Sequence, residues 1–314
     1  MIKQQLSDTG TVFPDGVIVV DKPADISSAA VVRKIKRLPC IKKVGHAGTL
    51  DPFATGVLVC PVNRGTRLSQ FFLHDRKKYA ATLRLGTATD TQDHTGRVLA
   101  EKTVDNIPES TIKRVFSRFL GDIEQLPPVY SALKHEGVPL YRHARNGRFI
   151  QKPPRNVHIS YMDIRDIRLP DIHFEVDCSA GTYIRTLCAD IGEVLGCGGH
   201  LRTLVRLQSS GFRLDEAITL ERLALLEDPD QLESIVIPMA DALRGIPALV
   251  ADDRVQEKIR HGRMLGLTDF PDTGRLQPHG GCAKVTAPDG RLLAVIHAHE
   301  KELHYEYRCV FHYH

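Results

Sequence analysis

The sequence predicts an α+β protein in which a largely antiparallel mixed sheet is followed by a small C-terminal β-barrel. Strand-like and helix-like patterns alternate irregularly up to about residue 210, without the strict βαβ order of a parallel sheet. Gly245-Ile246-Pro247 then interrupts the chain, and short alternating strands with glycine-rich turns follow. We therefore expect two domains, residues 1–245 and residues 246–314.

Each strand of the first domain is predicted from an apolar pattern. The continuous run Val17-Ile18-Val19-Val20 indicates a buried strand that ends at Asp21-Lys22-Pro23. Alternation of apolar and polar residues predicts further strands over 79–85, 157–164 and 172–178.

Helices are predicted between these strands from spacing and capping residues. Ser27 or Ser28 can cap a helix with Val31, Ile35 and Leu38 on its apolar face. Residues 112–119 have helical spacing, and Gly121 lies where a C-cap is expected. After a turn at Gly181, a third helix has its core face at Ile184, Leu187, Cys188, Ile191 and Leu195.

The second domain is expected to contain one short helix and several short strands. The helix spans residues 253–260, and turns rich in glycine and proline occupy 269–281. Strands are expected over 282–285, 292–296 and 305–313.

Composition indicates a cytoplasmic globular protein. Hydrophobic residues make up 42% and charged residues 25% of the 314 positions, which is ordinary for such proteins. No apolar run approaches the ~18 residues of a membrane span, and the polar N-terminus lacks a signal-peptide core. The seven cysteines are scattered without a Cys-x-x-Cys pair, which argues against a disulfide framework or a zinc site.

The most informative segment is Gly45-His46-Ala47-Gly48-Thr49-Leu50-Asp51-Pro52-Phe53-Ala54-Thr55-Gly56, here called the signature loop. It holds one carboxylate, Asp51, in a turn of glycines and small residues just before an apolar run. The following proline disfavours helical dihedrals at Asp51. Catalytic groups are often held in this way on a loop at the edge of a strand. An ordinary Asp-Pro turn is the alternative.

Arg185 is a second candidate, because it lies in the first turn of a predicted helix. The positive end of the helix dipole disfavours a cation there by up to ~1 kcal/mol. We therefore expect the guanidinium to form an ion pair with a carboxylate. A structural ion pair or a surface arginine is the alternative. Tyr79 begins an apolar strand and is equally consistent with core packing.

Basic residues gather in three clusters, and two of them flank the signature loop. The net charge is only +4, so this clustering is more informative than the total. The clusters are Lys34, Lys36, Arg37, Lys42 and Lys43; then Arg64, Arg67, Arg76, Lys77 and Lys78; then Arg142, Arg145, Arg148, Lys152 and Arg155. These clusters either contact RNA phosphates or form an ordinary solvated surface, and the sequence leaves both roles open.

Five blocks in order resemble the TruB-type tRNA pseudouridine synthases of bacteria, which act on uridine 55 of the T arm. The blocks are Asp21-Lys22-Pro23 with Ser28; the signature loop; Lys77-Lys78-Tyr79 leading to Gly86 and Thr89-Asp90-Thr91-x-Asp93; Pro128-x-Tyr130-Ser131-Ala132-Leu133-Lys134; and Gly181-Thr182-Tyr183-Ile184-Arg185-Thr186-Leu187. They cover most of residues 16–210. The chain departs from the family pattern at Asp25, where the family has glycine, and at Ser27.

The resemblance implies a pseudouridine-synthase catalytic domain followed by a PUA-like RNA-binding domain. It implies that Asp51 is the nucleophile, that Arg185 keeps it ionised, and that Tyr79 stacks on the base or takes a sugar proton. His46, Lys22, Tyr183, Lys77 and Lys78 would contact the RNA or line the pocket. Whether the aspartate attacks the sugar or the base, or stabilises a glycal-like intermediate, stays open.

The same resemblance implies base flipping, because an enzyme cannot reach a glycosidic bond inside a stacked helix. The isomerisation involves no redox step, so no cofactor is expected, and no metal site is expected either. The expected partner is the tRNA T stem-loop, bound by a monomer that needs no protein partner and does not bind membranes.

Two other functions remain open from the sequence. One is a guide-RNA-dependent pseudouridine synthase of the same lineage, although the chain lacks long lysine-rich tails. The other is a non-catalytic RNA-binding or RNA-folding protein, which would have no need of Asp51, Tyr79 and Arg185 together.

Overall fold

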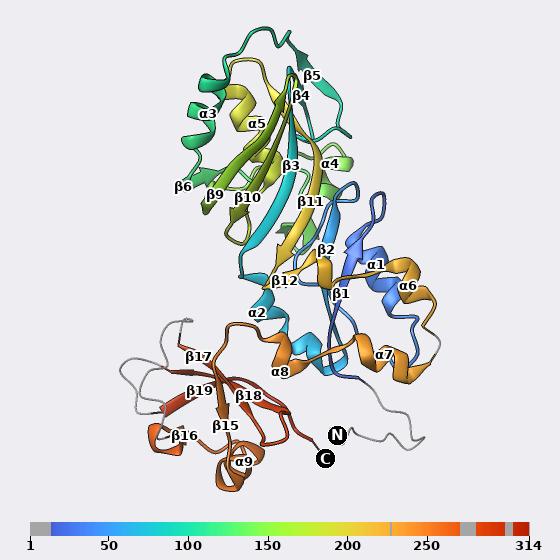
Figure 1. Ribbon diagram of the computed structural model, residues 1–314, viewed down its shortest axis with the longest axis vertical. Coiled ribbons are helices and arrows are strands. Elements are labelled where there is room, and N and C mark those ends of the chain that lie inside the picture. Colours follow the sequence, from blue (N-terminus) through green and yellow to red (C-terminus); the bar gives the residue numbers. More distant parts are fainter. Residues whose placement is uncertain (1–13, 227, 271–280, 299–303, 314) are drawn as a thin grey trace.

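The computed structural model describes residues 14–226, 228–270, 281–298 and 304–313. A long mixed sheet forms the body of the protein, and a smaller sheet built from the C-terminal residues packs beside one end of it (Figure 1). The predicted α+β class with a largely antiparallel sheet is therefore confirmed. Among the described ladders of the main sheet, only β1–β13 and β2–β11 are parallel.

The main sheet places residues distant in sequence on neighbouring strands. Its central order is β13-β1-β2-β11-β3-β10-β9-β6, with β12 added to β11 and β14 added to β1. The strands are β1 (Gly16–Lys22), β2 (Thr55–Val62), β3 (Lys77–Leu85), β6 (Gly121–Gln125), β9 (Arg155–Arg168), β10 (Asp171–Cys178), β11 (Gly199–Ser209), β12 (Phe212–Arg213), β13 (Ile218–Thr219) and β14 (Ile237–Pro238).

Helices cover this sheet in two groups. Helices α3 and α5 pack on the half that contains β3, β9 and β10, whereas α1, α6 and α7 lie beside β1 and β2 (Figure 1). The helices are α1 (Ser28–Ile35), α2 (Ser69–Leu73), α3 (Glu109–Ser117), α4 (Leu140–Arg145), α5 (Ile184–Val194), α6 (Leu220–Ala224), α7 (Pro229–Ile235), α8 (Met239–Ala242) and α9 (Asp253–Arg260).

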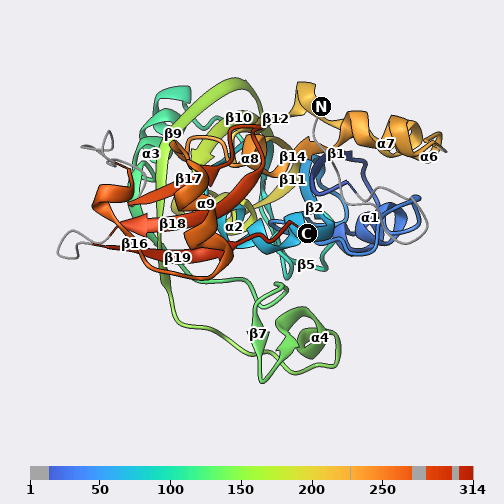
Figure 2. The same ribbon diagram turned by 90° about the horizontal axis from the view of Figure 1, so that it is seen from below.

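Two small hairpins extend from the main sheet. One pairs β4 (Thr87–Thr89) with β5 (Val98–Glu101), and the other pairs β7 (Lys134–His135) with β8 (Val138–Pro139). The second hairpin leads into α4, and Figure 2 shows this β7-β8-α4 segment projecting away from the rest of the molecule.

Most predicted elements form, with two corrections. The 112–119 helix ends earlier than expected, because α3 stops at Ser117 and Gly121 begins strand β6 with a φ of +87°. No strand was predicted over residues 199–209, yet β11 is central in the sheet. The predicted turns at 271–280 lie outside the described residues.

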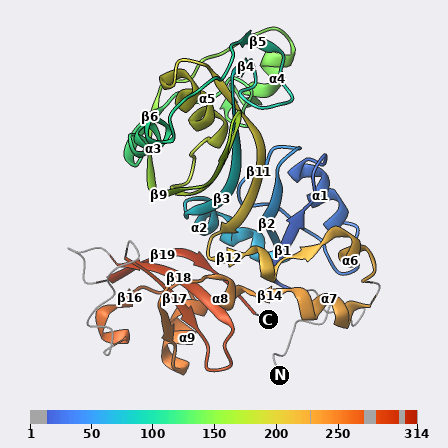
Figure 3. The same cartoon turned by 45° about the horizontal axis from the view of Figure 1, so that its top comes forward.

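The C-terminal strands form an open, curled sheet. Its order is β15 (Ala248–Val250), β17 (Cys282–Thr286), β18 (Leu292–Ala298), β19 (His304–Val310) and β16 (Leu265–Gly266). No ladder joins β15 to β16 in the described residues, so the strands form half of a barrel there. Figure 3 shows this sheet lying against α2 and α8 of the main body.

Candidate functional site

The first half of the signature loop runs along strand β2. The Gly45 amide donates to the Pro61 carbonyl at 3.0 Å, and the Ala47 amide donates to the Val59 carbonyl at 2.9 Å. The loop thus continues the sheet beside β2 rather than standing free in solvent. Ala47, Leu50 and Ala54 are buried, which fixes the loop further.

The backbone on each side of Asp51 is held by a buried polar side chain. Ser28 Oγ donates to the Leu50 carbonyl at 3.0 Å and accepts from the Leu50 amide at 2.9 Å. Lys22 Nζ donates to the Pro52 carbonyl at 3.0 Å. Lys22 and Ser28 therefore fix the position of the signature loop on both sides of Asp51.

The predicted ion pair between Asp51 and Arg185 forms. Arg185 Nε lies 2.9 Å from Asp51 Oδ2, and Arg185 Nη2 donates to Asp51 Oδ1 at 3.4 Å. Two contacts from one guanidinium to one carboxylate fix both the distance and the plane of the acid. The Arg185 side chain is 6% exposed and that of Asp51 is 34% exposed, so the carboxylate is the solvent-facing member.

Arg185 is itself held on three sides. Its Nη1 donates to the Thr91 carbonyl at 3.0 Å, and its Nη2 donates to the Tyr130 carbonyl at 2.9 Å. Buried Asp93 supplies a second carboxylate, with Oδ2 at 3.6 Å from Arg185 Nη1. The two carboxylates offset the unfavourable end of the α5 dipole.

Burial raises the pKa of the Asp51 carboxyl above its ordinary value of 3.8, and the charge of Arg185 opposes that rise. The neighbouring Asp93 carboxylate adds to the increase. The charge of Arg185 therefore favours the ionised form of a partly desolvated acid, against the effect of burial.

Tyr79 lies on β3 close to this pair. The residue is 9% exposed, and it belongs to the same apolar cluster as Leu50 and Ala54 of the signature loop. Burial raises the pKa of its phenol, and the Arg206 guanidinium opposes the rise. Asp51 also acts electrostatically on the Tyr79 phenol, which places the two groups in one neighbourhood.

His46 and Tyr183 complete the set of polar and aromatic side chains around the loop. Burial lowers the pKa of His46, with Arg206 adding to the effect, and its Nδ1 is buried without a hydrogen-bond partner among the described residues. Tyr183 precedes α5, where its amide donates to buried Gln125 at 3.0 Å. The Arg155 guanidinium lies over the Tyr183 ring, 4.4 Å from its centroid, as in a cation–π contact.

The three predicted RNA-binding lysines differ in accessibility. Lys22 is 0% exposed, and its ammonium also donates to the carbonyls of Pro23 and Ile26. Lys77 is 6% exposed and donates to Leu73 and Asp75 carbonyls. Lys78 forms an ion pair with Glu175 at 2.7 Å and remains partly exposed. Burial and carbonyl partners favour positioning roles for Lys22 and Lys77 over direct RNA contact.

The second basic cluster is used largely within the protein. Arg64 donates to the His312 carbonyl at 2.8 Å, and Arg67 donates to the Val310 carbonyl at 2.5 Å. Arg76 pairs with Asp177 at 3.2 Å. In contrast, Arg142, Arg145 and Arg148 are exposed on the projecting α4 segment, and Lys34, Lys36 and Arg37 are exposed around the end of α1. These two groups form exposed basic surfaces.

Two polar residues near the site were not among the predicted site residues. Asp93 belongs to the third of the five blocks that resemble the family, and its carboxylate accepts hydrogen bonds from Thr91 Oγ1 and Thr95 Oγ1. Arg206 lies outside all five blocks, and the sequence marks it only as a basic residue within an apolar stretch. The replacement at Asp25 preserves the turn, because Asp25 adopts the left-handed φ of +62° that suits glycine.

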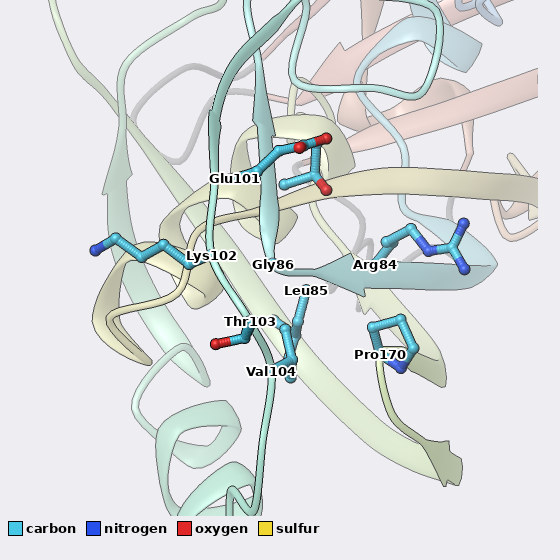
Figure 4. Close-up of a pocket in the computed structure, with 9 residues that line it drawn as sticks. Arg84, Leu85, Gly86, Glu101, Lys102, Thr103, Val104 and Pro170 are labelled. Carbon is cyan, nitrogen blue, oxygen red and sulfur yellow. The ribbon is translucent and has the colours of Figure 1, made fainter.

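A cavity of about 540 Å³ lies elsewhere, at the far end of β3 (Figure 4). Arg84 to Thr87, Glu101 to Val104 and Pro170 line it, and none of the predicted site residues does. In the described part of the chain, no group of three or more His, Cys, Asp or Glu side chains is arranged to hold a metal ion. None of the described helices is long and apolar enough to cross a membrane.

Comparison with solved structures supports the fold. The chain matches one chain of "Crystal Structure of a Cbf5-Nop10-Gar1 Complex" with a TM-score of 0.72 and 25% identity, covering 98% of this chain and 91% of the other. It matches one chain of "Structure of H/ACA RNP bound to a substrate RNA containing 2'-deoxyuridine" with a TM-score of 0.70 and 25% identity, covering 95% and 85%.

The fold and two family models together define a pseudouridine synthase. The family description "TruB family pseudouridylate synthase (N terminal domain)" matches residues 36–184, and "tRNA pseudouridylate synthase B C-terminal domain" matches residues 185–244.

Curated relatives carry the name tRNA pseudouridine synthase B. The relative from Syntrophotalea carbinolica is 46% identical over 235 residues, which cover 75% of this chain and 76% of the relative. The relative from Syntrophus aciditrophicus is 41% identical over 288 residues, which cover 90% of each. The chain therefore belongs to the TruB family of tRNA pseudouridine synthases, enzymes that isomerise uridine to pseudouridine.

Proposed function

We propose that this enzyme converts uridine 55 in the T-arm loop of tRNA to pseudouridine, with the base flipped out of the stem-loop and Asp51 as the nucleophile. The observation that carries this proposal is the Asp51–Arg185 pair, in which the arginine is buried and the acid remains 34% exposed. An ionised, oriented and accessible carboxylate is what nucleophilic attack on a nucleotide requires.

The remaining residues around the loop suit the binding of an extruded nucleotide. Tyr79 offers a ring for stacking and a hydroxyl for proton transfer. The lowered pKa of His46 favours the neutral imidazole, which suits contact with an uncharged part of the nucleotide. Tyr183 would line the pocket beside Arg155.

Two exposed basic surfaces are suited to the phosphates of the T stem. We assign that role to the arginines of α4 and to the basic residues around the end of α1. We also propose that the C-terminal curled sheet binds RNA away from the chemistry, in the manner of a PUA domain. The enzyme is proposed to act as a monomer in the cytoplasm, without a cofactor or a protein partner.

A guide-RNA-dependent synthase is the second candidate, because the two structural neighbours were solved as a ribonucleoprotein and as a multiprotein complex. The curated relatives, which share 41–46% identity with this chain, favour the stand-alone enzyme. Pseudouridine mapping in tRNA incubated with the purified protein alone distinguishes the two. Modification that requires added RNA and protein components would favour the guide-dependent enzyme.

The nucleophile is tested with the isosteric substitution Asp51→Asn. We expect it to abolish pseudouridine formation on a T-arm stem-loop while RNA affinity, measured by filter binding, stays largely intact. Asp105→Asn is the matched control, because Asp105 is exposed and lies outside the site. Normal turnover by Asp51→Asn would remove Asp51 from the nucleophile role.

A further inference from the structure

Arg206 is a fully buried arginine in the centre of the main sheet. It is 1% exposed and lies on β11, the strand between β2 and β3. Its direct partner on β3 is Tyr79, and its partner on β2 is Gly56. Residues directly opposite each other on neighbouring strands project from the same face of the sheet, so the Arg206 and Tyr79 side chains lie together.

The Arg206 guanidinium joins strand β2 to the signature loop. Its Nε donates to the Val57 carbonyl at 2.7 Å, and its Nη2 donates to the Gly48 carbonyl of the signature loop at 3.0 Å. Tyr79 lies directly opposite Arg206 on the neighbouring strand β3, on the same face of the sheet. Burial raises the pKa of the Tyr79 phenol, and the nearby Arg206 charge opposes that rise. One side chain therefore ties β2 to the signature loop and lies beside Tyr79.

Gly56 makes the position of Arg206 possible. Gly56 has a φ of +99°, and a Cβ atom there would lie 2.3 Å from the Arg206 carbonyl oxygen. Only glycine allows β2 and β11 to approach this closely at the end of the loop.

The charge of Arg206 is not matched by an acid. Arg185 has two carboxylates, but no ion pair within 4.0 Å joins Arg206 to a carboxylate in the described residues. A buried cation without an anion is costly, and two backbone carbonyls could equally be satisfied by an uncharged donor. The Tyr79 oxygen is the group beside it on which negative charge can develop.

We propose that Arg206 is a positioning residue that acts through its cross-strand neighbour Tyr79, stabilising negative charge on the phenol oxygen. Each reactive group then has its own arginine: Arg185 for Asp51 and Arg206 for Tyr79. The contribution of this contact to turnover rests on the proposed role of Tyr79 in catalysis.

The direct test is the pKa of Tyr79 in the free enzyme. Isotope labelling of the tyrosine ring carbon that carries oxygen reports ionisation by NMR, and Tyr79→Phe identifies the signal among the 8 tyrosines. We expect Arg206→Gln to raise the pKa of Tyr79 by about one unit or more, and Arg206→Lys, which keeps the charge, to raise it less. An unchanged pKa in both variants would overturn the proposal. This titration uses no RNA, so its result is independent of the proposed substrate.

Ser28→Ala is the matched control, because the Ser28 hydroxyl anchors the signature loop through the Leu50 backbone and not through Tyr79. We expect it to leave the pKa of Tyr79 unchanged. A shift as large as that in Arg206→Gln would mean that loop displacement, rather than the guanidinium, sets the pKa, and would contradict the proposal.

Kinetics separate positioning from simple structural support. We expect Arg206→Lys to lower kcat by at least about tenfold with KM changed by less than about threefold. The double variant Arg206→Lys with Tyr79→Phe should have a kcat no lower than that of the slower single variant, since both substitutions act through the Tyr79 phenol. Additive losses, or a change in KM alone, would overturn the proposal. If Arg206→Gln does not fold, the Tyr79 titration in Arg206→Lys and the double-mutant cycle of Arg206→Lys with Tyr79→Phe still test the proposal.

Discussion

Buried cations around the signature loop serve two different purposes. Arg185 meets carboxylates, whereas Lys22 and Lys77 meet backbone carbonyls and have pKa values lowered to about 8 by burial. The position of a lysine in a basic motif therefore did not predict its exposure. The Arg185 pair was predictable, because a cation in the first turn of a helix is unfavourable unless an acid lies nearby.

The Asp51–Arg185 pair predicts how activity depends on pH. The pKa of Asp51 is raised by burial and restrained by Arg185. Because the carboxylate form is the reactive one, kcat should fall as pH falls through that pKa, at a pH above 3.8. Arg185→Gln removes the restraining charge and should move this acid limb to higher pH.

Arg185→Lys is the informative companion variant. It keeps a positive charge, so the acid limb should move less than in Arg185→Gln. A point charge cannot reproduce the planar fork, so kcat on the plateau should fall by about a hundredfold. Exposed Arg168→Gln serves as the control for charge alone. Single-turnover rates across pH provide the measurement, and an acid limb at the same pH in Arg185→Gln would contradict the assignment.

At the scale of single elements, regular patterns were predictable and interrupted ones were not. Strands β1 and β10 and helix α5 follow clear periods, and their predicted ranges agree with the structure to within a few residues. Strand β11 was missed because its pairing shifts between Leu201 and Thr203 and again between Arg206 and Gln208. Each shift breaks the alternation of period two, and Arg206 places a charge where the pattern of a buried strand requires an apolar residue.

Helix α5 also contains a carboxylate whose ionisation opposes folding. Burial and the nearby Glu193 raise the pKa of Asp190 to about 6, from an ordinary value of 3.8. Asp190 lines a cavity of about 350 Å³ with Glu193, Glu124 and Arg118. Since the folded state holds the proton more tightly, the contribution of this group to stability is full below pH 3.8 and is lost as pH rises through about 6.

Asp190→Asn should therefore stabilise the enzyme above that pH. The group is partly exposed, so screening reduces the expected gain to about 1 kcal/mol in the free energy of unfolding. The gain should shrink as the pH is lowered, because wild-type Asp190 is then protonated. Urea unfolding at neutral and acidic pH measures both values. A gain of equal size at both would show that ionisation of Asp190 is not the cause.

At the scale of the whole molecule, the C-terminal sheet shares a core with the catalytic body. Leu292, Val295, Cys309 and Phe311 from that sheet lie in one buried cluster with Val17, Val59, Leu68 and Phe72 from the main body. Arg64 and Arg67 extend this contact, lying over the rings of Tyr313 and Phe311 at 4.3 and 5.0 Å. The first strand of the C-terminal sheet begins at Ala248. The sequence could not show that the two sheets share apolar contacts, because these residues are far apart along the chain.

This shared core predicts that the two sheets unfold together. Phe311 is 2% exposed, and Phe311→Ala should lower the free energy of unfolding by about 3–5 kcal/mol through lost burial and the cavity left behind. Leu225→Ala is the control, because Leu225 is 76% exposed and its truncation should change stability by less than about 0.5 kcal/mol. Native-state hydrogen exchange distinguishes coupled from independent unfolding. If the sheets are coupled, amides of β2 and of β18 lose protection by the same factor in Phe311→Ala. Loss confined to β18 and β19 would instead show that the C-terminal sheet opens on its own, and that the catalytic body does not depend on the cluster they share.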